Sequence, residues 1–123
     1  MKRIVIIPVL LISIISYTKP VPTGKPKLPQ KGKASFYSDK YSGKRTANAE
    51  KYNPNLLTAA HETLPLGKLV KVTNLINNQS AIVKINDRCA CARYGRIIDL
   101  SRVAATQINM ISKGVVKVKI EEI

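Results

Sequence analysis

Carboxylic acids can transfer protons, and Asp87, Glu50 and Asp99 are three of the seven in this chain. Asp87 follows the apolar run at 81–85, so a strand over this run would project its carboxyl group into a groove. Glu50 lies in a polar segment, and Asp99 lies within a short apolar run. A general acid must keep its proton near neutral pH, which requires a pKa raised by burial or by a neighbouring carboxylate. A nearby cation lowers the pKa of a carboxyl group. Whether the Arg88 side chain points toward Asp87 or away from it therefore matters.

Each of these acids could also have a role that involves no catalysis. Asp87 could only form a turn, and Asp99 could stabilise the start of the helix expected next in the chain. Glu50 could be a solvated charge in a loop. His61, the single histidine of the chain, could likewise be structural. The residue types alone leave both explanations open.

Cys89 and Cys91 follow Asp87 closely and are separated by one residue. In an extended strand their side chains would face opposite sides, so a bond between them requires a tight turn. An intrachain disulfide, free thiols, a bridge to another chain and a metal site all remain open. Two cysteines and one histidine make a thin ligand set for zinc, so no metal is expected.

Strands with one helix are predicted to position these residues. Ser101 is a plausible N-cap for a helix that runs to about Met110. Asn77-Asn78 lies between two alternating runs and predicts a hairpin. Such a pattern over about 90 residues predicts a small, mainly β, closed barrel. Residues 39–55 are predicted to form a long loop, and strands are predicted at residues 32–38, 69–75, 80–86 and 115–120. Residues 97–100 form a short apolar stretch.

The first residues resemble a leader rather than part of a domain. A basic start and an apolar stretch at 4–15, too short to span a bilayer comfortably, predict a signal peptide over 1–18 with an uncertain cleavage site. Residues 19–31 (KPVPTGKPKLPQK) are predicted to be a solvated linker. Residues 32–123 then form the one domain that this length allows. No cysteine stands directly after the apolar stretch, so a lipid anchor is not expected.

The charge of the chain is strongly positive. It has 21 Lys and Arg against 7 Asp and Glu, a net charge of +14. Such a protein is attracted to polyanions by forces that salt weakens. Export to the periplasm or cell envelope would bring it to wall glycan and anionic lipid, not to nucleic acid. Membrane association through the N-terminal segment and a monomeric state are also expected.

Seven short motifs follow one another from residue 32 to residue 101. They are GKASFY (32–37), RTANAE (45–50), TAAH (58–61), TLPLG (63–67), VKVTN (70–74), INDR (85–88) and GRIIDLS (95–101). Together they resemble the rare lipoprotein A (RlpA) family of lytic transglycosylases. That resemblance covers essentially the whole predicted domain and implies a six-stranded double-psi β-barrel.

The resemblance implies endolytic cleavage of peptidoglycan glycan strands between N-acetylmuramic acid and N-acetylglucosamine. The C6 hydroxyl of the muramic acid replaces water and leaves a 1,6-anhydro end, without metal or organic cofactor. Proton transfer by a carboxyl group is the central step. Asp87 is expected to be the general acid and base, with Glu50, His61 and Asp99 as further catalytic residues. The implied substrate-binding residues are Thr46, Asn48, Tyr37, Arg88 and Arg96.

Two departures from the family pattern lie near the expected site. Cys89-Ala90-Cys91 replaces a segment that begins with Gly in the family, and Ala49 stands where Gly is usual. The first change motivates an alternative function, in which an expansin-like module binds or loosens wall glycan without cleaving it.

Overall fold

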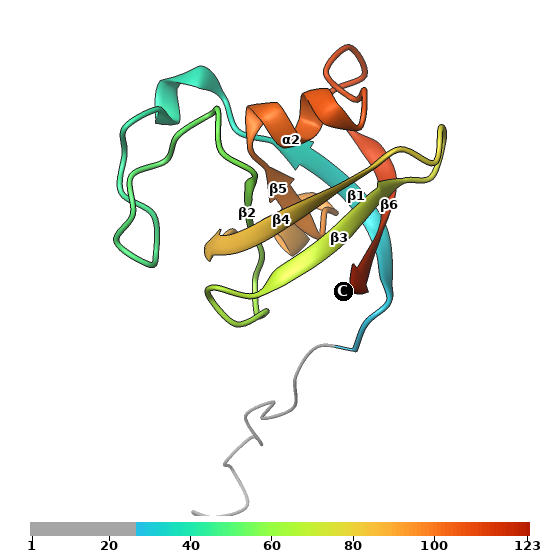
Figure 1. Ribbon diagram of the computed structural model, residues 1–123, viewed down its shortest axis with the longest axis horizontal. Helices are drawn as coiled ribbons and strands as arrows, with labels where there is room; N and C mark the ends of the chain where they lie inside the picture. The colour runs from blue at the N-terminus through green and yellow to red at the C-terminus, as the bar shows by residue number, and fades with distance from the viewer. Residues whose placement is uncertain (1–26) are drawn as a thin grey trace, which may run out of the picture.

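Six strands close into a barrel between residues 27 and 123, the part of the chain that the computed structural model describes (Figure 1). Their order around the barrel is β1-β5-β2-β4-β3-β6. Closure gives each strand two hydrogen-bonded neighbours, which removes free edges. The expected mainly β barrel of six strands with one short helix is confirmed. The strands are β1 (Gln30–Phe36), β2 (Thr58–Ala60), β3 (Leu69–Asn74), β4 (Ser80–Asp87), β5 (Ile98–Leu100) and β6 (Val116–Glu122).

The predicted signal peptide, 1–18, and most of the predicted linker, 19–31, lie outside the described residues. β1 begins at Gln30, so the last residues assigned to the linker are part of the barrel. Within residues 27–123, no helix has the length and apolar character that crossing a bilayer requires.

The predicted hairpin is formed by β3 and β4. The two strands are antiparallel, with Val70 opposite Val83 and Val72 opposite Ala81. All four side chains are buried, while the residues between them alternate to the outer face. The two-residue alternation in the sequence therefore matches one face turned to the core.

Branched aliphatic side chains fill the barrel interior, as the scarcity of aromatic residues requires. Each fully buried Val, Leu or Ile contributes about 1.5–3 kcal/mol relative to an exposed one. The helix α2 (Arg102–Gln107) closes one side of this core with Ala104 and Ala105. The largest fully buried aliphatic residues of the strands are Val70, Val72, Val83, Ile85, Ile98, Leu100, Val118 and Ile120.

Two local features differ from the prediction. The helix starts at the expected cap, because Ser101 Oγ accepts a hydrogen bond from Ala104 N at 3.4 Å. It ends at Gln107 rather than near Met110, and Asn109 adopts the left-handed φ of 55° that interrupts a helix. The three-residue strand β2 was not predicted, since so short a segment carries no detectable alternation.

Candidate active site

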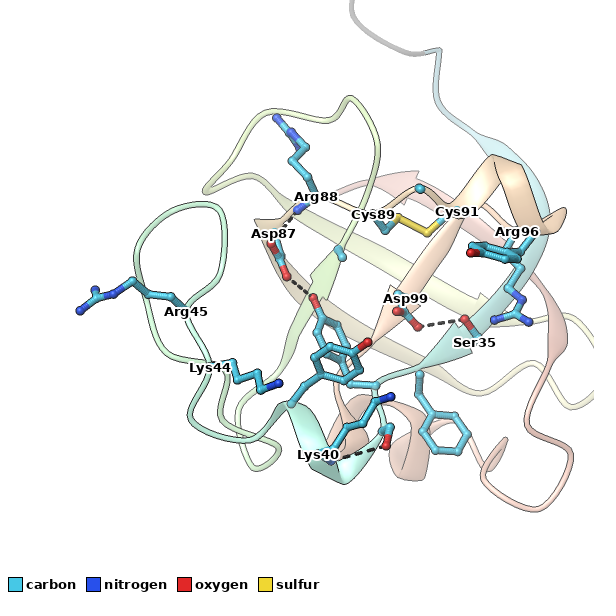
Figure 2. A pocket seen from close by; sticks show the side chains of 17 residues that line it. Ser35, Lys40, Lys44, Arg45, Asp87, Arg88, Cys89, Cys91, Arg96 and Asp99 are labelled. Atoms are coloured by element: carbon cyan, nitrogen blue, oxygen red, sulfur yellow. Dashed lines mark hydrogen bonds between the residues drawn. A yellow bond between two sulfur atoms is a disulfide. The ribbon is translucent and has the colours of Figure 1, made fainter.

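A cleft of about 630 Å³ opens over the ends of four strands. Its wall includes Asp87 from the end of β4 and Asp99 from β5 (Figure 2). β1 contributes Ser35 to this wall. Tyr37, the first residue after β1, also lines the cleft. The loop after β1 adds cations at the rim, among them Lys44. The cleft thus joins two carboxyl groups with a positively charged border.

The strand register places Ala60 between the two aspartates. β2 is hydrogen-bonded to β4 on one side and to β5 on the other, with Ala60 aligned with both Asp87 and Asp99. Two interstrand steps put the backbones of the aspartates about 10 Å apart. Because Ala60 has only a methyl side chain and itself lines the cleft, the space between the carboxyl groups stays open.

Both carboxylate oxygens of Asp87 accept hydrogen bonds. Oδ2 accepts the Tyr37 hydroxyl at 2.5 Å. Oδ1 accepts the backbone N–H of Ala47 at 2.8 Å and that of Arg88 at 2.9 Å. All three partners are donors, so Asp87 is held in one orientation as a hydrogen-bond acceptor.

The Arg88 guanidinium does not clamp the neighbouring carboxyl group. Its Nη1 donates to the backbone oxygen of His61 at 3.2 Å and to that of Leu64 at 2.6 Å. Figure 2 shows the side chain directed away from the Asp87 carboxyl group. Arg88 therefore braces the segment after β2, and only its backbone N–H contacts the acid.

Tyr37 is held by two further aromatic rings. Its ring stacks on Tyr52 at a centroid distance of 4.3 Å and meets Tyr41 edge-on at 5.8 Å. Burial raises the pKa of Tyr37, and the hydrogen bond to Asp87 raises it further. The phenol consequently remains protonated and acts as a fixed donor.

Asp99 occupies a different environment on the opposite side of Ala60. One of its oxygens accepts the Ser35 hydroxyl at 2.9 Å. Burial raises the pKa of Asp99 above its ordinary value, and this effect outweighs the opposing influences of Ser35 and Arg96. The charge of Asp87 acts in the same direction as burial. Of the cleft's two acids, Asp99 has surroundings that favour retention of a proton.

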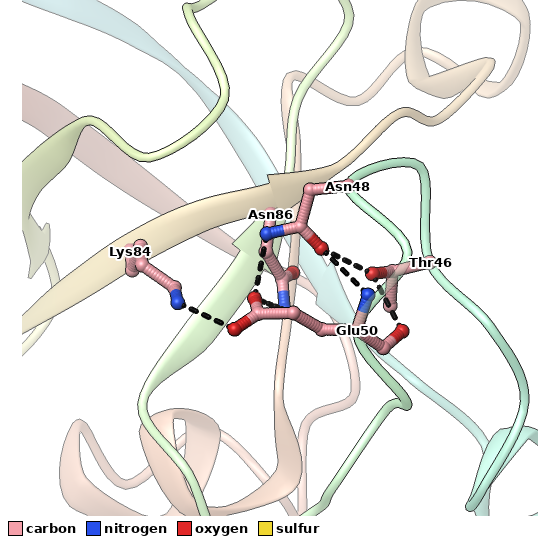
Figure 3. A network of polar contacts seen from close by, with 5 residues as sticks. All are labelled: Thr46, Asn48, Glu50, Lys84 and Asn86. Atoms are coloured by element: carbon pink, nitrogen blue, oxygen red, sulfur yellow. Dashed lines mark hydrogen bonds and ion pairs between the residues drawn. The ribbon is translucent and has the colours of Figure 1, made fainter.

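Glu50 is not part of the cleft wall. Its carboxylate pairs with Lys84 Nζ at 2.8 Å and accepts from Asn48 Nδ2 at 2.6 Å and from Asn86 Nδ2 at 3.3 Å (Figure 3). The hydrogen bonds from Lys84 and Asn48 lower the pKa of Glu50 to about 2. Glu50 is thus a constant anion on the outer side of the loop that holds Ala47 against Asp87.

Thr46 and Asn48, both expected to bind substrate, are engaged within that loop. Thr46 Oγ1 donates to Asn48 Oδ1 at 2.7 Å, and Asn48 Oδ1 also accepts the Glu50 backbone N–H at 3.1 Å. Neither residue lines the cleft. Ala49 adopts a left-handed φ of 73°, a conformation that Gly adopts without strain. These contacts shape the loop rather than reach the cleft.

His61 is buried behind the cleft, and its ring does not line it. Nδ1 accepts the backbone N–H groups of Thr63 and Leu64, both at 3.1 Å, so the ring proton resides on Nε2, which contacts Gln30 Oε1 at 2.9 Å. Burial lowers the pKa of His61, and the charge of Arg88 adds to the effect. A neutral ring thus fixes the backbone that pairs with the end of β4.

The cysteines form an intrachain disulfide, Cys89–Cys91, at the rim of the cleft (Figure 2). It precedes the 3₁₀ turn η3 (Cys91–Tyr94), which leads to Arg96. The Ala92 backbone N–H is held by Glu62 Oε1 at 2.5 Å. Within residues 27–123, no cluster of side chains could hold a metal ion.

Of the residues expected from the sequence, Asp87, Asp99, Tyr37, Arg88 and Arg96 line the cleft, and other parts of the cleft were not expected. The missed residues are Ser35, Lys40, Lys44, Arg45 and Ala60, together with the backbone N–H of Ala47. The alternation of β1 could have revealed Ser35, which shares a strand face with Tyr37. No sequence signal distinguishes the three cations from other exposed ones.

The sequence of the barrel is similar to that of known proteins. The family model described as lytic transglycolase matches residues 29–120. The chain is 54% identical over 90 residues to the endolytic peptidoglycan transglycosylase RlpA of Pasteurella multocida, covering 73% of this chain and 30% of that protein. The protein of the same name from Rickettsia bellii is 50% identical over 106 residues, covering 80% and 46% respectively. The chain therefore spans less than half the length of these curated relatives.

A solved structure supports the fold alone. The Streptomyces papain inhibitor matches with a TM-score of 0.57 and 24% sequence identity, covering 84% of this chain and all of that chain.

Proposed function

Because this chain belongs to the RlpA family of lytic transglycosylases, we propose that it cleaves peptidoglycan glycan strands between N-acetylmuramic acid and N-acetylglucosamine. The observation that carries the proposal is the placement of Asp87 and Asp99 in one cleft, on either side of Ala60. Cleavage requires one group to give a proton to the leaving oxygen and another to stabilise or relay positive charge. The cleft offers one acid for each task.

We assign the two tasks differently from the sequence-based expectation, which made Asp87 the general acid and base. Asp99, whose pKa burial raises, gives its proton to the glycosidic oxygen while the bond from that oxygen to C1 breaks. Asp87, which accepts three hydrogen bonds, faces the positive charge that develops on the sugar ring. The C6 hydroxyl then attacks C1 and passes its proton to Asp87. Return of this proton to Asp99 through water completes the cycle, so no proton is gained or lost.

His61 and Glu50 support this reaction as positioning residues. The His61 backbone N–H donates to the Asp87 backbone oxygen at 3.1 Å, which fixes the end of β4. Glu50 holds the loop whose Ala47 N–H contacts the Asp87 carboxylate. Both residues act through Asp87, since neither side chain lines the cleft.

The cations at the rim fit an anionic glycan. Lys40, Lys44, Arg45 and Arg96 all line the cleft. A muramic acid without its peptide carries a free carboxylate, which such a border attracts over long range. We therefore assign glycan stripped of peptide as the preferred substrate, and Arg96, which lies nearest Asp99 in sequence, as one contact.

The remaining expectations complete the proposal. Residues 1–18 direct export, the residues from 19 up to the start of β1 at Gln30 link the leader to the barrel, and the domain acts in the periplasm or cell envelope as a monomer. Its partner is wall glycan rather than nucleic acid. Brief membrane association would come through the N-terminal segment.

Digestion of purified, peptide-free glycan tests the activity. Mass spectrometry should detect products with 1,6-anhydro ends, and Asp87→Asn should lower their formation about a thousandfold. Products with ordinary reducing ends, or a fully active Asp87→Asn variant, would refute the mechanism.

The disulfide at the rim favours one alternative function. Cys89–Cys91 replaces the family's Gly-containing segment beside Asp87 and stiffens this border of the cleft. An expansin-like module would use the cleft to bind or loosen wall glycan without cutting it. Salt-sensitive glycan binding with no soluble products would favour this alternative.

A further inference from the structure

One face of β1 leads from solvent directly into the cleft. Side chains alternate along a strand, so Lys31, Lys33 and Ser35 point to the same side. Lys31 and Lys33 are exposed, while Ser35 and the following Tyr37 line the cleft. Lys33 and Ser35 are about 7 Å apart along the strand. The exposed lysines therefore continue the cleft wall across the outside of the barrel.

The neighbouring strand β6 doubles the positive charge of this face. Its antiparallel register places Lys119 opposite Lys31 and Lys117 opposite Lys33, and β1 and β6 run side by side in Figure 1. We call these four residues the lysine block. Cross-strand neighbours have Cβ atoms about 5 Å apart, so the four side chains emerge together.

The charge of the lysine block is poorly compensated. Lys119 Nζ lies 3.4 Å from Glu121 Oε1. In the part of the chain that the structure describes, the other three lysines form no ion pair. Like charges directly opposite each other destabilise an antiparallel pair, so the arrangement costs the fold stability. A bound polyanion would offset this repulsion.

Arg96 connects the lysine block with the cleft. The residue after it, Ile97, donates its backbone N–H to Lys33 O at 2.8 Å, which holds the two segments side by side. Arg96 itself lines the cleft. Cations thus follow one another from Lys119 and Lys31, through Lys33 and Arg96, to the edge of the site.

We propose that the lysine block binds the part of an anionic glycan strand that extends beyond the cleft. The inference rests on the proposed function, because the bound polymer is the substrate itself. Peptide-free glycan repeats a carboxylate at every muramic acid, and a strand seated between Asp87 and Asp99 that leaves along β1 passes over these lysines. The continuous strand face favours this occupant over a membrane surface, since it connects the lysines to the cleft.

Glycan length separates this site from the cleft. Binding is measured for long peptide-free strands and for a muramic-acid-containing tetrasaccharide, which fills only the cleft. All variants carry Asp87→Asn so that strands stay intact. Lys31→Gln/Lys33→Gln should bind long strands about fivefold more weakly, as expected for two exposed ion pairs. Tetrasaccharide binding should not change.

The matched control removes two charges elsewhere. Lys51 and Lys113 are exposed, lie outside β1 and β6 and do not line the cleft, so Lys51→Gln/Lys113→Gln should bind long strands as the parent does. Equal losses in the two double variants would mean a general charge effect and overturn the proposal. The proposal would also be overturned if Lys31→Gln/Lys33→Gln bound phosphatidylglycerol vesicles more weakly but bound glycan unchanged. That result would assign the lysine block to lipid binding. Because binding needs no cleavage, the comparison remains decisive even if wild type forms no anhydro products.

Discussion

The Tyr37 hydroxyl donates a 2.5 Å hydrogen bond to Oδ2 of Asp87, and the ring that carries it is stacked on Tyr52. The rings of Tyr41 and Tyr52 pack against the Tyr37 ring and hold its hydroxyl in the position from which it donates to Asp87. The orientation of the Asp87 carboxylate therefore depends on an aromatic cluster as well as on the end of β4. This link leads to the first prediction.

Tyr37→Phe should preserve the aromatic stack but lower kcat on peptide-free glycan about tenfold, the effect of losing a hydrogen bond to a charged group. Tyr41→Phe is the matched control, since Tyr41 lines the same cleft and the hydroxyl that donates to Asp87 belongs to Tyr37. An unchanged kcat in Tyr37→Phe would contradict the role of this bond.

Asp99 should make stability fall with rising pH. Burial raises its pKa above the ordinary 3.8, so above that pH the folded protein holds a proton that the unfolded chain releases. The free energy of unfolding then decreases as pH rises from about 3.8 through the raised pKa of Asp99. Asp99→Asn removes this contribution and keeps an oxygen for Ser35. In urea titrations, the variant should gain stability relative to wild type between acidic and neutral pH; a constant difference would contradict the assignment.

The same substitution should abolish proton donation. Asp99→Asn is expected to reduce cleavage about a hundredfold or more while tetrasaccharide binding persists. Product analysis at several pH values provides the measurement. An Asp99→Asn enzyme with wild-type kcat would return the role of general acid to Asp87.

Glu50 and Lys84 should contribute to activity as one unit. Their ion pair joins the loop at 46–50 to β4, and that loop supplies the Ala47 N–H to Asp87. Glu50→Gln and Lys84→Gln should each lower kcat roughly threefold, with little change in KM, because the pair is largely solvent-exposed. The double variant should be no worse than either single one, as expected for residues that act together. A direct catalytic role for Glu50 would instead give a large loss that Lys84→Gln does not reproduce.

The disulfide should be visible by alkylation of the intact protein. Because Cys89 and Cys91 are bonded to each other, mass spectrometry should find no alkylated thiol without reduction and two after it. Alkylation of both residues before reduction would disprove the bond. Matched glycan digestions with and without reductant then measure how much the stiff rim contributes to activity.

Local sequence patterns were sufficient for much of the fold. The alternation of Val70 and Val72 with polar neighbours predicts β3, because a strand exposes and buries successive side chains. Ser101 predicts the start of α2, since capping depends on residues within one turn. The alternation of β3 and the cap of α2 both depend on residues that lie close together in the sequence, so the spacing of residue types is enough to predict them.

The motifs were also sufficient to select Asp87 and Asp99, but not to separate them from Glu50 and His61. All four stand in segments that resemble the same family. The structure places the first two in the cleft, Glu50 beside Lys84 outside it, and His61 behind it. Each of the four is an ionisable residue within a motif, so the sequence alone offers no basis for deciding which of them line the cleft.

By itself, then, the sequence determined the family, most strands, the helix cap and the set of candidate acids. Only the closed barrel decided that Ala60 aligns with both aspartates, that Tyr37 reaches Asp87, and that Lys31 faces Lys119. These relationships join residues far apart in the chain through strand register. Burial and hydrogen-bond partners, which set the proton affinity of an acid, exist only after those strands have paired.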